Sequence, residues 1–86
     1  MNMVTLIDST GSVLTYEVSW SYVRKVFPQK IEVITVMDHV FLVDGDSLEK
    51  SLDLNIEATE VSNTPIFGPA LMMSAEDYSK MKAGLN

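Results

Sequence analysis

The sequence predicts a single α+β domain, in which a small, mainly antiparallel sheet of about five strands packs with two helices, the second at the C-terminus. Three observations predict this fold class. Short segments rich in Val, Ile, Leu and Thr recur along the chain, an apolar helical spacing follows the first two of them, and a helix-start pattern precedes the last residues. A chain of 86 residues holds one core, so residues 1–86 should form one domain.

Residues 3–7 and 12–18 are predicted to form a β-hairpin. Both segments are rich in residues that favour strands, such as Val, Thr and Tyr. Between them lies Asp8-Ser9-Thr10-Gly11, a turn sequence whose glycine can adopt a positive φ.

A helix is predicted over residues 20–27. Apolar side chains recur there at the i, i+3 and i+7 positions of one helical face, namely Trp20, Val23 and Phe27. Ser19 is the expected N-cap, and Pro28 ends the helix because the residue before a proline avoids the α conformation. Arg24 and Lys25 should lie on the exposed side.

Two strands are expected next, at residues 30–37 and 40–43, joined by a turn at Asp38-His39. The first is rich in β-branched residues, and the second consists of apolar residues only. A short uninterrupted apolar run indicates a strand that is buried on both faces. The strand at 40–43 should therefore lie inside the sheet.

Residues 46–61 fit two periods. Their acidic residues recur at steps of three and four, as on one helical face, with Leu48, Leu52 and Ile56 on the opposite stripe. The part from 52 to 58 also alternates between apolar and polar residues, as a half-buried strand does. Both alternatives stay open, and the favoured arrangement is a short helical turn after Asp46 followed by extended chain around Asn55.

The last strand is expected at residues 66–73. Proline lacks the N–H that a sheet ladder needs, so Gly68-Pro69 should place an edge or a bulge in this strand. A terminal helix should follow, with Ser74 as its N-cap, the acidic pair Glu76-Asp77 at the positive end of its dipole, and Gly84 at its end.

Segments of the second half of the chain resemble a family of small uncharacterised proteins encoded by phages and plasmids. They are the strand pair that begins Lys30-Ile31-Glu32-Val33 and ends Leu42-Val43-Asp44, the Asn-x-x-Ala-Thr box at 55–59, and the Gly-x-Ala-Leu strand at 68–71. The resemblance covers about residues 30–73. It implies a compact α+β unit encoded by a mobile element, and it transfers no activity and no functional residue.

Composition limits the class of protein further. The 47% of hydrophobic residues suits a globular domain, and the absence of cysteine excludes disulfides and thiolate metal sites. The longest apolar run, at 40–43, is far shorter than the roughly 20 residues that span a bilayer. The residues before Asp8 lack the basic start of a signal peptide. We expect a cytoplasmic protein without membrane contact, and a homo-oligomer because small domains often need extra burial.

No enzyme, cofactor or metal is expected. The single histidine, His39, lies beside Asp38 without a nucleophile motif, so the simplest interpretation is a solvated turn residue. The segment 44–49 has its glycine at the wrong position for a calcium loop. Asn55 and Thr59 are most simply interpreted as groups that cap the backbone. Six basic residues against twelve acidic ones disfavour direct binding of nucleic acid.

The net charge of −6 lies in one stretch of the chain. Seven carboxylates and one lysine fall between residues 38 and 60, and the rest of the chain has five acids and five bases. An acidic strip attracts basic partners. The first hypothesis is therefore stoichiometric binding to a basic surface of a host protein, as a counter-defence inhibitor would do. The residues expected to steer this contact are Asp46, Glu49, Asp53, Glu57 and Glu60.

Alternatives to this hypothesis stay open. The acidic strip could merely keep a small domain soluble, or its carboxylates could imitate spaced DNA phosphates. A different class of function is an oligomeric protein that sequesters a small nucleotide-type signal molecule in a pocket between protomers. The residues expected to line that pocket are Trp20, Tyr22, Arg24 and Lys25.

Overall fold

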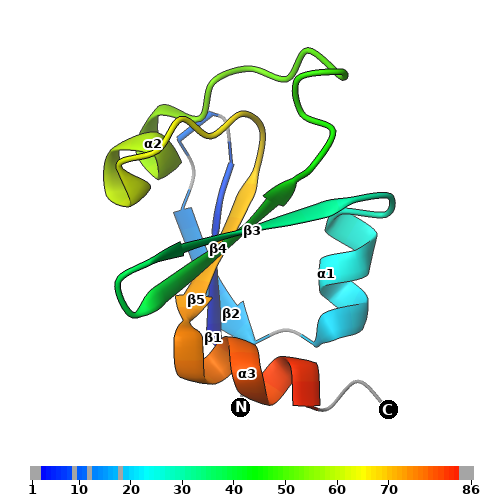
Figure 1. Ribbon diagram of the computed structural model, residues 1–86, viewed down its shortest axis with the longest axis vertical. Coiled ribbons are helices and arrows are strands. Elements are labelled where there is room, and N and C mark those ends of the chain that lie inside the picture. Colours follow the sequence, from blue (N-terminus) through cyan, green and yellow to red (C-terminus); the bar gives the residue numbers. More distant parts are fainter. Residues whose placement is uncertain (1–2, 9, 12, 18, 84–86) are drawn as a thin grey trace.

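The computed structural model describes residues 3–8, 10–11, 13–17 and 19–83, and it confirms the α+β class (Figure 1). Its elements in chain order are β1 (Met3–Ile7), β2 (Val13–Glu17), α1 (Trp20–Val26), β3 (Ile31–Val36), β4 (His39–Asp44), α2 (Ile56–Ser62), β5 (Ala70–Ser74) and α3 (Ala75–Ala83). The helix α2 adds to the two helices that the sequence predicts. Within the described part of the chain, no helix combines the length and apolarity needed to cross a membrane.

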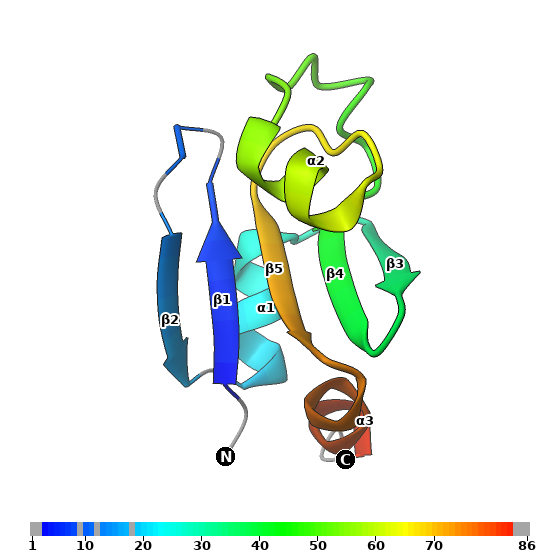
Figure 2. The same ribbon diagram turned by 90° about the vertical axis from the view of Figure 1, so that its left-hand side faces the viewer.

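The five strands form one antiparallel sheet in the order β2-β1-β5-β4-β3. The last strand in sequence, β5, therefore lies at the centre of the sheet, between β1 and β4 (Figure 2). The two hairpins, β1–β2 and β3–β4, do not pair with each other, and β5 joins them. The strands β2 and β3 form the two edges.

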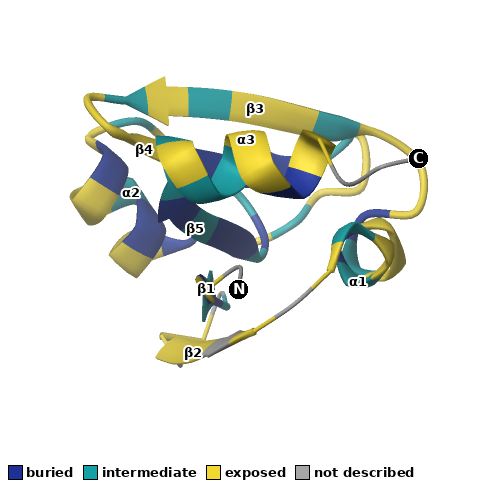
Figure 3. Ribbon diagram, turned by 90° about the horizontal axis from the view of Figure 1, so that it is seen from below, coloured by how far each residue is buried: buried dark blue, intermediate teal, exposed yellow. Residues whose placement is uncertain are grey.

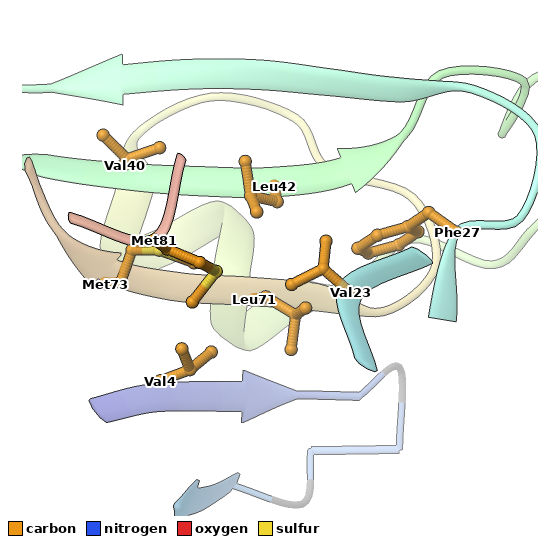
Figure 4. Close-up of a cluster of buried hydrophobic side chains, with 8 residues drawn as sticks. All are labelled: Val4, Val23, Phe27, Val40, Leu42, Leu71, Met73 and Met81. Carbon is orange, nitrogen blue, oxygen red and sulfur yellow. The ribbon is translucent and has the colours of Figure 1, made fainter. Parts of the chain in front are cut away.

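Helices pack against both faces of the sheet. One face carries a buried apolar cluster, to which the strands, α1, the residue after α1 and α3 contribute side chains (Figure 4). Its members are Val4, Val23, Phe27, Val40, Leu42, Leu71, Met73 and Met81. The other face carries a second cluster, to which α2 contributes Ala58, and its further members are Ile7, Phe41, Val43, Ile66 and Ala70. Figure 2 shows α1 and α2 on opposite sides of the sheet.

The strand β4 is buried on both faces, as its apolar run predicts. Val40 and Leu42 belong to the first cluster, whereas Phe41 and Val43 belong to the second. Successive side chains of a strand point to opposite faces, so an inner strand with helices on both sides needs apolar residues at every position.

The segment 46–62 differs in part from the favoured arrangement. The expected helical turn after Asp46 is present, because the Lys50 N–H donates to the Asp46 carbonyl at 3.0 Å. Extended chain follows, in which Leu54 forms an isolated bridge with Phe67. Immediately after Asn55, however, the chain turns into α2, so the interpretation of residues 52–58 as continuous extended chain is wrong.

Strand and helix ends show smaller differences. The last strand begins at Ala70 instead of residue 66, since Gly68 has φ +82 and the following proline cannot donate to a ladder. The turn between β3 and β4 is Met37-Asp38, and His39 is already the first residue of β4. In this two-residue loop Met37 has φ 57, the positive value that tight hairpins require at the first loop position.

The N-cap predicted for α3 is present with its hydrogen bond, whereas the N-cap residue predicted for α1 is in the expected position without that bond. The Ser74 hydroxyl accepts a hydrogen bond from the Asp77 N–H at 3.0 Å, as an N-cap does. Ser19 occupies the N-cap position of α1 but makes no side-chain cap bond, because its hydroxyl lies 2.7 Å from that of Ser21. Gly84, expected to end the terminal helix, lies outside the described residues.

Candidate functional site

The candidate site occupies the end of the sheet where β4 ends and β5 begins. The loop 45–55 and α2 lie there together, at the end of the molecule opposite α3 (Figures 1 and 2). This loop carries three carboxylates of the acidic strip, Asp46, Glu49 and Asp53, so its anchoring decides where these three lie.

Asp44 anchors the start of the loop. Its buried carboxylate accepts hydrogen bonds from the Asp46 N–H and from the Lys50 ammonium, each at 2.8 Å. Burial alone would raise the pKa of the Asp44 carboxyl. The two hydrogen bonds and the charge of Lys50 outweigh burial, so its pKa lies below the ordinary value. The charge of Asp44 is thus offset by Lys50, and its side chain is buried.

Asn55 anchors the end of the loop, and it is fully buried. Its Nδ2 group donates to the carbonyls of Ile7 and Gly68, both at 2.8 Å, while its Oδ1 accepts from the Ala58 N–H at 3.0 Å. Every hydrogen bond of this side chain goes to backbone. The amide therefore joins the start of α2 to β1 and to the segment before β5, which is the capping role expected for it.

Thr59 continues this network one turn along α2. Its hydroxyl accepts from the Ile66 N–H at 2.9 Å and lies 3.4 Å from the Ile66 carbonyl. In the Asn-x-x-Ala-Thr box, Asn55 thus caps the start of α2, and Thr59 hydrogen-bonds this helix to the segment before β5. Ala58 between them is small and fully buried against the sheet.

The five carboxylates expected to bind a partner come from three kinds of backbone. Asp46 and Glu49 lie in the turns after β4, Asp53 lies in the extended segment, and Glu57 and Glu60 lie on α2. They share one end of the molecule without sharing one helix face. Asp46 is half-buried and the other four are exposed, and none of the five forms an ion pair with a described residue.

Large apolar side chains are exposed among these carboxylates. Leu48 is 77% exposed and Ile56 is 64% exposed, and Leu54 and Val61 are also exposed. The helical period had predicted a stripe of Leu48, Leu52 and Ile56, but only Leu52 turns inward, over Gly68. We call the nine residues together the acidic–apolar end: Asp46, Glu49, Asp53, Glu57 and Glu60 with Leu48, Leu54, Ile56 and Val61.

The residues expected to bind a nucleotide lie elsewhere, on α1. Trp20 and Tyr22 are half-buried and pack against the first cluster, and Arg24 and Lys25 are exposed in the last turn. An apolar cavity lies beside α2 on the other face of the sheet, and none of these four residues lines it. A pocket between protomers built from them stays a prediction.

A cavity of about 340 Å³ lies beside α2 on the face of the second cluster. Its walls are mainly apolar, formed by Val36, Met37, Phe41, Val61 and Met72, and Asp38 and His39 also line it. Sequence reasoning missed it because its residues come from β3, β4, α2 and β5. No local pattern in the chain indicates that these residues meet.

The pair Asp38 and His39 provides no catalytic arrangement. The His39 Nδ1 lies 2.9 Å from the Asp38 Oδ1, but the His39 side chain is half-exposed and no hydroxyl of a described residue hydrogen-bonds to it. Among the described residues, no group of three or more His, Cys, Asp or Glu side chains is arranged to hold a metal.

Comparison with known proteins adds no relative: no protein-family model matches the chain, no curated protein is significantly similar to it, and no solved structure matches its fold.

Proposed function

We propose that the protein acts by stoichiometric binding and not by catalysis, with the acidic–apolar end occupying a basic, partly apolar surface of a host protein. In the mobile-element setting that the sequence suggests, this would be a counter-defence inhibitor. One observation carries the proposal: Leu48 and Ile56 are exposed among five carboxylates that form no ion pair with a described residue.

The exposed apolar residues favour an interface over a merely solubilising face. A surface that serves only solubility gains nothing from exposed Leu and Ile beside its charges. On α2, the spacing of four residues places Ile56 beside Glu60 and Glu57 beside Val61. The two exposed apolar side chains of α2, Ile56 and Val61, therefore each have a carboxylate next to them. Apolar anchors with charges at their rim are the usual anatomy of a protein–protein contact.

The two kinds of residue would have separable effects. The carboxylates steer a basic partner toward the surface and raise the association rate, which salt then lowers. The apolar residues become buried on contact and mainly set the dissociation rate. Imitation of DNA needs only the charges, so an effect of Ile56 also distinguishes a protein surface from a DNA-binding groove.

A charge-matched pair of variants tests the proposal. The double variant Glu57→Lys/Glu60→Lys changes α2, whereas the control Glu17→Lys/Glu76→Lys makes the same change of charge at exposed positions of β2 and α3. Immobilised wild type should retain a basic host protein in low salt and release it in high salt. The control should retain the same protein, and the α2 variant should lose it.

A second comparison tests the apolar residues with the protein so identified. We expect Ile56→Ser to raise its dissociation rate about tenfold or more, which corresponds to about 1.4 kcal/mol. Leu14→Ser, at an exposed position of β2, should leave the rate unchanged. If the α2 charge variant and the control retain the same proteins at every salt concentration, the proposal is wrong.

A further inference from the structure

The edge strand β3 has an open side. It pairs with β4 only, along six residue pairs from Ile31↔Asp44 to Val36↔His39. In Figures 2 and 3 it forms one margin of the sheet, and no other element lies beyond it. A strand in this position presents unpaired backbone groups, which pair readily with another strand.

The pairing with β4 fixes which backbone groups face outward. The Gly45 N–H donates to the Lys30 carbonyl at 3.0 Å, so residue 30 points its backbone groups toward β4. This direction alternates along an antiparallel strand, so residues 32, 34 and 36 also point to β4. The N–H and C=O groups of Ile31, Val33 and Thr35 point away from the sheet, and none of them bonds to a described residue.

The side chains of β3 do not protect this edge. Natural edge strands avoid pairing through lysines, prolines, bulges or a covering segment. The sequence of β3, Ile-Glu-Val-Ile-Thr-Val, contains no lysine and no proline, and its register with β4 is continuous without a bulge. Glu32 is its only charge, and Val33 is 43% exposed.

We propose that β3 pairs antiparallel with β3 of a second copy of this chain, with the twofold axis passing at Val33. In this register Val33 exchanges hydrogen bonds with the partner's Val33, and Ile31 exchanges them with the partner's Thr35. All three outward-facing residues of each copy are then paired. The interface is isologous and closed, so it stops at a dimer.

Charge and strand length select this register over its neighbours. The shift that pairs Ile31 with the partner's Val33 sets Glu32 directly opposite the partner's Glu32, which repels. The opposite shift pairs Ile31 with the partner's Met37, which lies in the hairpin loop, and so loses a pair. In the proposed register Glu32 faces the partner's Ile34.

The dimer would contain one continuous sheet of two times five strands. Because opposed residues of an antiparallel pair share a face, α1 of both copies lies on one side and α2 of both copies on the other. A single pair of edge strands is a small interface, so the association should be reversible and depend on concentration.

Lysine substitutions at the two sheet edges test the proposal. Val33→Lys places two ammonium groups opposite each other on the axis, while Val13→Lys makes the same change on β2, where Val13 is 51% exposed. We expect wild type and Val13→Lys to dimerise with the same dissociation constant in sedimentation equilibrium. Val33→Lys should fold, as circular dichroism reports, and should dimerise at least tenfold more weakly.

A cysteine cross-link tests the register and does not depend on the lysine variant. The chain has no cysteine, so Val33→Cys introduces a single thiol, and opposed Cβ atoms of an antiparallel pair come close to disulfide distance. Mild oxidation should give a covalent dimer from Val33→Cys and none from Leu14→Cys on β2. A wild type that stays monomeric at all concentrations, or a Val33→Lys variant that dimerises like wild type, overturns the proposal. So does cross-linking only between Val33→Cys and Leu14→Cys, which indicates head-to-tail pairing.

Discussion

Asp44 and Asn55 hold the two ends of the loop 45–55, which carries five of the nine residues of the acidic–apolar end. Both are buried polar residues whose hydrogen bonds stay within the protein. Asp44 accepts from the Lys50 ammonium and the Asp46 N–H, and Asn55 bonds to backbone groups only. A buried polar group is tolerated when it is paired in this way and costs stability when it is not. These two side chains therefore position the carboxylates of the loop and are themselves buried.

The pair of Asp44 and Lys50 predicts a specific dependence of stability on pH. The pKa of Asp44 is lowered by folding, so its contribution to the free energy of unfolding is present above the unfolded value of 3.8 and is lost as the pH falls through the lower, folded value. In urea titrations at several pH values, Asp44→Asn should be less stable than wild type by about 1–3 kcal/mol near neutrality. The difference should shrink below about pH 4.

Two lysine variants control this prediction. Lys50→Ala removes the charge that lowers the pKa of Asp44, so burial should then raise this pKa, and the stability that Asp44 contributes near neutrality and loses on acidification should be smaller than in wild type. Lys80→Ala breaks the exposed pair with Glu76, whose atoms lie 3.1 Å apart, and should change stability by no more than about 0.5 kcal/mol. Equal effects of the two lysine variants would contradict the role given to Lys50.

Sequence reasoning at this scale found the polar residues but not all their partners. Asn55 and Thr59 were predicted to cap backbone, and they do. The carbonyl of Ile7, which Asn55 also holds, lies 48 residues away in sequence, and no local pattern indicates it. The sequence did not indicate that Lys50 pairs with Asp44, because this ion pair depends on the conformation of the loop between them.

At the scale of elements, α2 shows why the segment 46–61 was ambiguous. Its seven residues bury only Ala58 and Ser62, so its sequence carries no broad apolar stripe. Its first residue, Ile56, is exposed, and the alternation that favoured a strand had treated this residue as buried. What fixes the helix is the cap from Asn55 and the attachment of Thr59 to Ile66. The hydrogen bonds of these two side chains thus override the local period.

Gly68 limits how the loop can pack over the start of β5. It has φ +82, and a Cβ there would lie 2.6 Å from the Leu52 Cδ1. Gly11 has a similar φ of +92, but a Cβ there would meet nothing within 4 Å. The two glycines share the same backbone requirement and differ only in steric surroundings.

Alanine at these two glycines should therefore separate backbone strain from crowding. We expect Gly11→Ala to cost about 1 kcal/mol, for the positive φ alone. Gly68→Ala should cost about 1–3 kcal/mol more, because Leu52 must move. Adding Leu52→Ala to Gly68→Ala should recover part of this excess. Denaturant melts of wild type, the two single variants and the double variant measure the coupling energy between the two positions. Additive effects of Leu52→Ala and Gly68→Ala would contradict this explanation.

For the whole molecule, the sheet order makes β5 the one described strand that pairs with both hairpins, through β1 and β4. Leu71 and Ala70 of β5 are both fully buried, one in each cluster. Isolated two-stranded hairpins are marginal in water, so neither half should persist when β5 is weakened. The sequence predicted the strands, the burial of β4 and the overall class. It could not predict the order of strands, because pairing of β1 with β5 joins residues more than 60 apart.

Weakening β5 should loosen both hairpins equally. Leu71→Ala should destabilise the domain by about 3–5 kcal/mol. Amide hydrogen exchange should then speed up by the same factor in β1 and in β4, because both lose their common neighbour. Leu14→Ala, at an exposed position of β2, is the control and should leave β4 unchanged. Faster exchange in only one hairpin after Leu71→Ala would show that the two halves are stable independently.

The central position of β5 also has a consequence for biosynthesis. As the polypeptide leaves the ribosome, β1–β2 and β3–β4 appear well before residues 70–74. Until then the inner sides of β1 and β4 lack their neighbour, and their apolar residues are available to other nascent chains or to chaperones. Domains whose sheet is completed by a late strand must remain soluble through this interval. The negative charge of residues 46–60, translated before β5, would repel identical nascent chains during that time.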